Sequence, residues 1–307
     1  MKTRFRPILA VGALVTAFGL LVTGCGTTDV ATEDGHVVEH AMGSTTVPDA
    51  PQRIVVLDSP HLDALLALDL TPIAFTERAM GYGAPKYLGD RLDGVATVGT
   101  IQEPDLDAIA ELEPDLIIGA KVRHEALYTQ LAAIAPTVFS VTSGTDWHDQ
   151  ATLTAAAVGE SAEMTRLITD LDTRAKAVGE RIGATGTTVS MVRFTQDRFR
   201  LYGPDTFSGS VLAQIGYTHP PREWNQYSMV ELDPEQYAQI NGDTVFHADY
   251  TGNATGTVKA RVVGLWGTLP GVRAGRDHAV DDDTWMLGIG VIGANKIIDD
   301  VARITAK

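Results

Sequence analysis

The chain has 307 residues, more than one hydrophobic core usually fills, and this length fits two lobes of roughly 120 to 150 residues. Hydrophobic residues make up 44% and charged residues 21%, which excludes a largely disordered chain. The formal net charge of −15 argues against a nucleic-acid-binding function and against a polybasic contact with membranes.

The N-terminal segment differs from the rest of the chain. Three basic residues within the first six precede an apolar stretch over 8–22, which is short and rich in Gly and Ala. Such a segment is typical of a secretory signal peptide and not of a membrane span. It ends in the sequence LVTGC at Cys25, which resembles the bacterial lipobox. We therefore predict a signal peptide over residues 1–24 and lipidation of Cys25.

Cys25 is the only cysteine of the chain and cannot form an internal disulfide. Lipidation would remove a free thiol from an oxidising compartment, and two or three acyl chains hold a protein firmly to a membrane. The alternative is an ordinary cleavage site with Cys25 as a leftover thiol. Residues 25–35 are predicted to be the lipidated cysteine and a polar tether. Loss of residues 1–24 would remove three positive charges and change the net charge from −15 to −18.

Short apolar strands alternate with helical patterns over residues 36–146, which predicts a parallel sheet covered by helices on both faces. The expected strands are 53–57, 71–75, 114–119 and 136–140. The expected helices are 61–70, 106–112 with Asp105 as its N-cap, and 123–134. We assign this region to an N-terminal α/β lobe.

Residues 149–182 carry a purely helical pattern without proline, with apolar residues spaced three and four positions apart. The pattern predicts one helix of about 33 residues and roughly 50 Å that ends at Gly183. That length suits a spine between two lobes, and we assign residues 147–183 to it.

The alternation of strands and helices returns over residues 184–307, which we assign to a C-terminal α/β lobe. The expected strands are 187–194, 198–202, 244–246 and 279–281. The expected helices are 208–215, 235–240 with Asp233 as cap and Pro234 at its first position, and 289–304. The predicted fold is therefore α/β, with two Rossmann-like lobes whose central, mainly parallel sheets are joined by one long α-helix.

Several blocks in this order resemble the iron-siderophore solute-binding lipoproteins of ABC importers, in the branch whose lobes are joined by a rigid helix. The resemblance covers residues 36–307. It is carried by the blocks 36–40, 46–48 and 51–57, by 103–109 with 112–118, and by 198–207 with its Gly203-Pro204 pair. It implies an opening β-hairpin, no enzymatic activity and no cofactor. It also implies that a ferric siderophore is captured between the lobes and delivered to a permease with its ATPase, at the outer face of the cytoplasmic membrane.

The resemblance implies one acidic residue on each lobe that docks with arginines of the permease. Glu235 occupies this position in the C-terminal lobe. Asp107 occupies it in the N-terminal lobe, where Glu is usual, and the nearby Glu103 is an alternative. Acidic residues also favour helix N-termini for electrostatic reasons, so a purely structural role is the other interpretation.

A ferric siderophore already surrounds its iron with six oxygen ligands, so the protein needs cations and aromatic faces and no metal ligands. Ligands of open α/β sheets lie at the carboxyl ends of the strands. This rule selects Arg78, Tyr82, Arg123, Arg193, Tyr202, Tyr250 and Trp285. Trp224 is added because it lies in the loop 220–229, whose two adjacent prolines and aromatic residues suggest a shaped rim. Arg193 is the strongest candidate because it interrupts an apolar run and needs a partner, which could instead be a structural carboxylate such as Asp197. Trp285 could instead belong to the core.

The few basic residues at strand ends and the acidic chain favour a hydroxamate complex, near neutral in charge, over a strongly anionic tris-catecholate complex. Haem or cobalamin in the same cleft is an alternative, and so is a bare metal ion such as zinc bound by His61, His124 and His247. A lipoprotein enzyme is a further alternative, but the chain has no G-x-S-x-G or H-E-x-x-H motif. We interpret the acidic run 281–283 as a solvated turn.

Overall fold

The computed structural model describes residues 35–250 and 256–305. The predicted signal peptide, the lipidation site at Cys25 and nearly all of the tether lie outside these residues. No helix in the described part of the chain is both long and apolar enough to cross a membrane.

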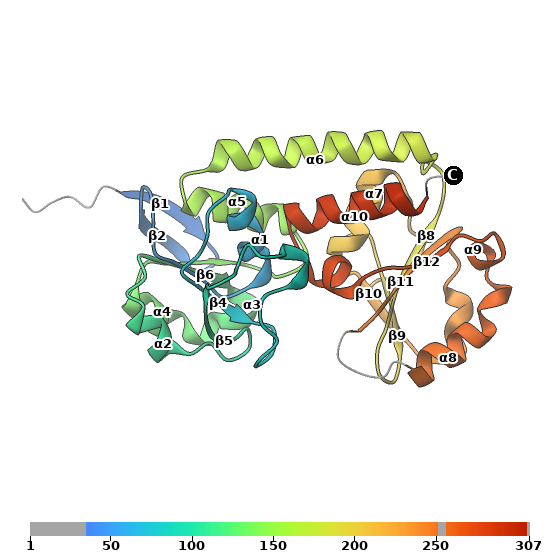
Figure 1. Ribbon diagram of the computed structural model, residues 1–307, viewed down its shortest axis with the longest axis horizontal. Coiled ribbons are helices and arrows are strands. Elements are labelled where there is room, and N and C mark those ends of the chain that lie inside the picture. Colours follow the sequence, from blue (N-terminus) through green and yellow to red (C-terminus); the bar gives the residue numbers. More distant parts are fainter. Residues whose placement is uncertain (1–34, 251–255, 306–307) are drawn as a thin grey trace, which may run out of the picture. The chain divides into compact units, whose positions relative to one another are not determined.

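An antiparallel hairpin opens the described chain (Figure 1). Its strands are β1 (Gly35–His40) and β2 (Gly43–Pro48), and the register pairs His36 with Val47. Val38 and Val47 are buried and belong to the same core cluster as strands of the N-terminal sheet. The hairpin that the family resemblance implied is confirmed.

Five parallel strands form the sheet of the N-terminal lobe. Their order across the sheet is β5 (Ala96–Thr100), β4 (Ala74–Glu77), β3 (Ile54–Val56), β6 (Leu116–Ala120) and β7 (Thr137–Ser140). The strands β3, β6 and β7 are buried along their whole length, as expected of strands covered on both faces. The helices of this lobe are α1 (Ser59–Ala67), α2 (Leu106–Glu111), α3 (Lys121–His124) and α4 (Tyr128–Ile134).

Two details of this lobe differ from the sequence prediction. The strand β5 was not expected, because only Val98 of its five residues is buried and Gly99 adopts a positive φ of 80°. The predicted helix over 123–134 is divided by the 3₁₀ turn η2 (Glu125–Leu127) between α3 and α4. The cap of α2 is confirmed, since the Asp105 side chain accepts a hydrogen bond from Ala108 N at 3.0 Å.

The sheet of the C-terminal lobe is mixed and not fully parallel. Its order is β10 (Met229–Leu232), β9 (Phe199–Tyr202), β8 (Val189–Phe194), β11 (Thr244–Asp249) and β12 (Asp277–Ala279). The strands β8, β11 and β12 run parallel, whereas β9 and β10 form antiparallel pairs. The other elements of this lobe are α7 (Phe207–Ile215), η3 (Pro234–Gln239), α8 (Gly256–Leu265), η4 (Trp266–Thr268), α9 (Pro270–Arg273), η5 (Asp283–Leu287) and α10 (Val291–Ile304).

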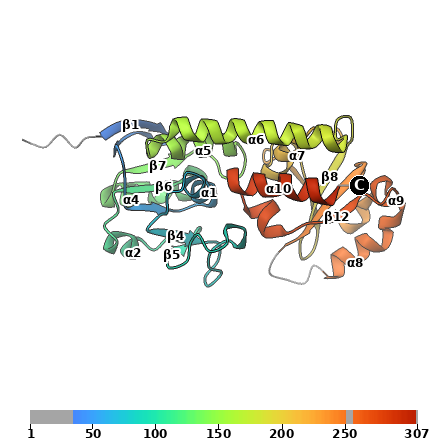
Figure 2. The same cartoon turned by 45° about the horizontal axis from the view of Figure 1, so that its top comes forward.

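The predicted spine is two helices instead of one. They are α5 (Trp147–Ala157) and α6 (Ser161–Ile182), and the chain between them turns at Gly159, whose φ is +77°. A positive φ is incompatible with a continuing right-handed helix. The 22 residues of α6 extend over roughly 33 Å and run past both lobes (Figures 1 and 2). The predicted end at Gly183 is confirmed, with a left-handed C-cap.

A buried contact between α1 and α10 joins the lobes below α6. The Asp63 carboxylate of α1 accepts hydrogen bonds from Ile292 N at 2.9 Å and Gly293 N at 3.1 Å, in the first turn of α10. Asp63 is fully buried, and burial raises its pKa from 3.8 to about 6. The lobes are therefore linked by α6 and by a helix cap from the opposite lobe, which favours a stiff connection.

Candidate ligand-binding cleft

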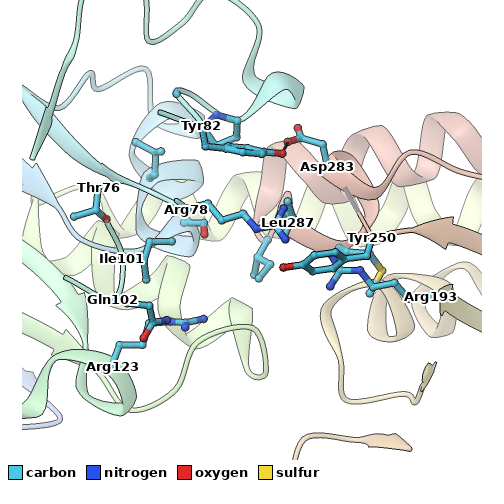
Figure 3. A pocket seen from close by; sticks show the side chains of 16 residues that line it. Thr76, Arg78, Tyr82, Ile101, Gln102, Arg123, Arg193, Tyr250, Asp283 and Leu287 are labelled. Carbon is cyan, nitrogen blue, oxygen red and sulfur yellow. Dashed lines mark hydrogen bonds between the residues drawn. The ribbon is translucent and has the colours of Figure 1, made fainter. Parts of the chain in front are cut away.

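A cavity of about 400 Å³ opens between the two lobes at the carboxyl ends of their strands (Figure 3). Ser59, Thr76 and Arg78 line it from the ends of β3 and β4, and Arg193 lines it from β8. The volume falls within the range of small-molecule sites. The position agrees with the rule that ligands of open α/β sheets bind beyond the carboxyl ends of the strands.

The cavity brings together five of the eight residues that the sequence selected for the ligand. They come from both lobes, and their side chains lie around one space in Figure 3. They are Arg78, Tyr82, Arg123, Arg193 and Tyr250. Three guanidinium groups and two phenol rings form the combination of cations and aromatic faces that an organic chelate requires.

Arg193 is 7% exposed and carries a bidentate ion pair. Its Nε donates to Asp282 Oδ1 at 2.5 Å, and its Nη2 donates to Asp282 Oδ2 at 2.7 Å. Arg193 therefore has the structural carboxylate partner that was left open, but this partner is Asp282 and not Asp197. Burial opposes the charge of Arg193, but the Asp282 carboxylate raises the pKa of the guanidinium above its usual value.

Arg123 has a similar partner in the N-terminal lobe. Its Nε donates to Asp58 Oδ2 at 2.9 Å, and its Nη2 donates to Ser143 Oγ at 3.4 Å. The other oxygen of Asp58 accepts from Ser59 N at 2.9 Å and caps α1. A buried carboxylate thus fixes an arginine beside the cavity in each lobe.

The ring of Tyr250 lies close to arginines of both lobes. The Arg78 guanidinium carbon is 4.8 Å from its centroid, and that of Arg193 is also 4.8 Å away. Arg78 additionally lies 5.4 Å from the ring centroid of Tyr82. These distances are those of cation–π contacts, so a C-terminal aromatic residue and an N-terminal cation meet across the cleft.

The acidic run 281–283 is not a solvated turn, because two of its members are buried. Asp283 accepts hydrogen bonds from the Tyr82 hydroxyl at 3.3 Å and from Tyr87 N at 2.7 Å. Burial raises the pKa of Asp283 above its usual value. Asp283 therefore lines the cavity, whereas Asp282 lies behind Arg193 and does not line it.

Comparison with known proteins identifies the family and the fold. The family model described as Periplasmic binding protein matches residues 54–276. The chain belongs to this family. A probable siderophore-binding lipoprotein of Bacillus subtilis, YfiY, is 36% identical over 89% of this chain and 88% of its own length. The Fe(3+) dicitrate-binding periplasmic protein FecB of Escherichia coli is 30% identical over 87% of this chain and 89% of its own length.

Solved structures support the same assignment. SirA of Staphylococcus aureus, in complex with staphyloferrin B, superposes with a TM-score of 0.77 at 26% identity, over 87% of this chain and 97% of that chain. The predicted architecture of two α/β lobes with a linking helix is confirmed. The relatives are solute-binding proteins, and this periplasmic binding protein is not an enzyme.

The other three predicted ligand residues of this binding protein lie outside the cavity. Tyr202 lines an adjoining pocket of about 170 Å³, which shares Met286 and Ile289 with the cleft. Trp285 borders the same adjoining pocket, but it is fully buried and its indole N–H donates to Asp300 at 3.0 Å, which favours the alternative that it belongs to the core. Trp224 is absent from the cavity lining and lies beneath the guanidinium of Arg222.

Sequence reasoning also missed several lining residues. Ser59 and Thr76 stand at the ends of β3 and β4, so the strand-end rule would have found them had it included hydroxyl side chains. Gln102 follows the unexpected strand β5 and could not be selected without it. The apolar members Met286, Leu287 and Ile289 precede α10 and carry no distinguishing signal in the sequence.

The three histidines of the zinc alternative do not form a site in this binding protein. The ring nitrogens of His61 lie 2.8 Å from Thr154 Oγ1 and 3.1 Å from Ser140 Oγ, and burial lowers its pKa to about 4. His124 contacts Ala120 N and Ile101 O, whereas His247 packs against Trp266 in the other lobe. Within residues 35–250 and 256–305, no three His, Cys, Asp or Glu side chains form a metal-binding group.

Both residues predicted to dock with a permease are exposed. Asp107 lies in the first turn of α2, and Glu235 lies in η3, a 3₁₀ helix closed by a capping box instead of the expected α-helix. Glu235 forms an ion pair with Arg261 of α8. In Figures 1 and 2, α2 and α8 lie on the side of the two lobes opposite α6.

Proposed function

We propose that this chain is the exported, lipid-anchored receptor of an ABC importer. In this proposal it captures a ferric siderophore in the cleft and delivers it to the permease for iron uptake. One observation carries the proposal: arginines and tyrosines of both lobes converge on one cavity at the strand ends. The names of its relatives support the ligand class, since they include siderophore-binding and Fe(3+) dicitrate-binding proteins.

The chemistry of the cleft suits a metal that arrives already chelated. The planar guanidinium groups of the arginines can donate two hydrogen bonds each to the outer oxygens of a chelate. The rings of Tyr82 and Tyr250 can stack on its organic scaffold. A bare metal ion would instead need several ligands gathered at one point. The chelate itself supplies those ligands to iron, so the residues of the cleft only have to bind its surface.

Among ferric chelates we favour the hydroxamate type. Two of the three cavity arginines are paired with aspartates, and Asp283 adds a carboxylate to the lining. A trianionic tris-catecholate complex would meet little net positive charge, whereas a near-neutral trihydroxamate complex needs none. Ferric carboxylate chelates are the second class, because the relative FecB is named for Fe(3+) dicitrate.

Asp107 and Glu235 are proposed to contact arginines of the permease. Both are exposed, Asp107 in α2 and Glu235 in η3, where it pairs with Arg261 of α8, and the helices α2 and α8 lie on the side of the lobes opposite α6 (Figure 1). Such charge pairs at the rim of an interface guide orientation and association rate. Cys25, after removal of residues 1–24, is proposed to carry the acyl chains that hold the receptor at the outer face of the cytoplasmic membrane.

Titration of the chain from residue 27 onward tests the proposal. The probes are a ferric trihydroxamate, a ferric tris-catecholate, ferric citrate, haem and zinc, and the signal is Trp and Tyr fluorescence. We expect saturable quenching at sub-micromolar ferric trihydroxamate, strongly weakened in Arg78→Ala and unchanged in the exposed control Arg166→Ala of α6. Saturation by haem or zinc alone would overturn the siderophore assignment.

A further inference from the structure

We infer that Asp58 and Asp282 determine which ferric chelates the cleft accepts. They act as counter-charges behind Arg123 and Arg193, and they make the cleft select chelates of low net charge. The inference rests on the proposed function, because it concerns the same cleft. It assigns a selective role to two carboxylates that do not themselves line the cavity.

The two pairs have the same construction, although they come from different lobes. Each aspartate side chain is 1% exposed, and each holds the Nε of an arginine that lines the cavity, at 2.9 Å for Arg123 and 2.5 Å for Arg193. A ligand would therefore contact the guanidinium while the carboxylate stays behind it. The arginine keeps its hydrogen-bonding edge, and its positive potential at the ligand is reduced.

The charge of Asp58 is not required for its structural role. Its Oδ1 caps α1 through Ser59 N at 2.9 Å, and an asparagine caps a helix about as well as an aspartate does. The negative charge therefore matters chiefly for Arg123, which its Oδ2 contacts. In the other lobe, Asp282 binds two nitrogens of Arg193 at 2.5 and 2.7 Å. That geometry places a full carboxylate directly against the guanidinium.

The result is a cleft whose charges nearly balance. Three arginines line it, and three carboxylates oppose them, of which Asp283 lines the cavity and the other two lie behind the arginines. A ligand carrying three negative charges is repelled by each carboxylate, whereas a neutral complex is not. Each aspartate should therefore lower the preference for a trianionic chelate, and we expect a factor of about ten for each.

The test compares two probes that differ mainly in charge. The dissociation constants of a ferric trihydroxamate and a ferric tris-catecholate are measured for the wild-type protein, Asp58→Asn and Asp282→Asn. The ratio of the two constants should shift toward the catecholate by about tenfold in each variant, and the shift should shrink at high salt. The matched control is Asp170→Asn, which removes a carboxylate paired with Arg166 on exposed α6. Its ratio should equal that of the wild type.

The outcomes separate this inference from the proposed function. If the wild type binds neither probe, nor ferric citrate, the proposed function fails and the inference fails with it. If the wild type binds a ferric chelate but neither variant changes the ratio, only the inference fails. Asp282→Asn leaves a buried arginine without its counter-charge, so thermal unfolding is measured alongside. In Asp58→Asn the unpaired arginine is Arg123, whose side chain is 32% exposed and can be solvated. This variant therefore tests the inference if Asp282→Asn does not fold.

Discussion

Tyr250 lies between arginines of opposite lobes and is 41% exposed, so its ring is available to a ligand. Replacing it with alanine removes the aromatic face and both cation–π contacts. We expect Tyr250→Ala to weaken ferric-chelate binding about tenfold, with little change in the melting temperature. Tyr250→Phe is the matched control and should bind nearly as well as the wild type, because it keeps the ring. Fluorescence titration and thermal unfolding measure the two effects, and equal affinities for the alanine variant and the wild type would contradict the prediction.

Individual cleft residues were predictable where strand ends decided their place. Arg78 and Arg193 follow or end buried strands, and the parallel topology brings those ends to one edge of each sheet. Trp285 also follows a short strand, but its ring turns into the core and pairs with Asp300. The direction of a side chain depends on packing between elements distant in sequence. The partner of Arg193 likewise lies 89 residues away, which no local pattern reveals.

At the scale of elements, the long helix α6 depends on a glycine for its contact with α7. A Cβ at Gly179 would clash with the backbone carbonyl of Ile215. We therefore expect Gly179→Ala to force the two helices apart and to lower the free energy of unfolding by about 2 to 3 kcal/mol. Gly264→Ala in α8 is the control, because a Cβ there meets open space, and it should stabilise the protein by up to ~1 kcal/mol. Urea denaturation measures both, and similar effects of the two substitutions would refute the argument.

The helix break at Gly159 and the strand β5 were not predicted, because packing between distant segments decides both. Apolar periodicity continued across Gly159, so the sequence pattern indicated one helix where the backbone turns between α5 and α6. A single glycine is tolerated in many helices, and its positive φ is set by packing. The strand β5 buries only Val98 and so lacked the apolar run that revealed β3 and β6. Strands buried along their whole length were therefore predictable, including the edge strand β7, whereas the half-exposed strand β5 was not.

At the scale of the whole molecule, Asp63 makes the link between the lobes sensitive to pH. Its pKa is raised by burial from 3.8 to about 6, so the folded state binds this proton more tightly than the unfolded state. Its contribution therefore favours folding at low pH and is lost as pH rises from about 4 to 6. The lost stability is about 3 kcal/mol by the linkage relation. The histidine His61 acts in the opposite direction, because its lowered pKa of about 4 reduces stability as pH falls below 6.5.

The variant Asp63→Asn separates the pH dependence due to Asp63 from that due to His61, because it removes only the titration of the Asp63 carboxyl group. The difference in unfolding free energy between the wild type and Asp63→Asn should change with pH, favouring the wild type more at pH 4 than at pH 7. Denaturant unfolding at both values provides the measurement. A difference that stays constant would mean that Asp63 titrates normally despite its burial.

Docking with a permease would involve both lobes at once, because each lobe supplies one acidic residue. Asp107 is exposed on α2, and Glu235 is exposed but already paired with Arg261 of α8, so a permease arginine would have to compete with that partner. An exposed ion pair contributes little stability, so replacing Arg261 by a permease arginine would cost little free energy. We expect the double variant Asp107→Lys with Glu235→Lys to abolish uptake of the ferric chelate, while its dissociation constant stays unchanged because neither residue lines the cavity. Arg261→Ala should instead leave uptake intact or increase it, since it frees Glu235. Uptake of radioactive iron in cells carrying each variant, with binding measured on purified protein, decides the matter: normal uptake by the double variant would remove these two residues from the interface.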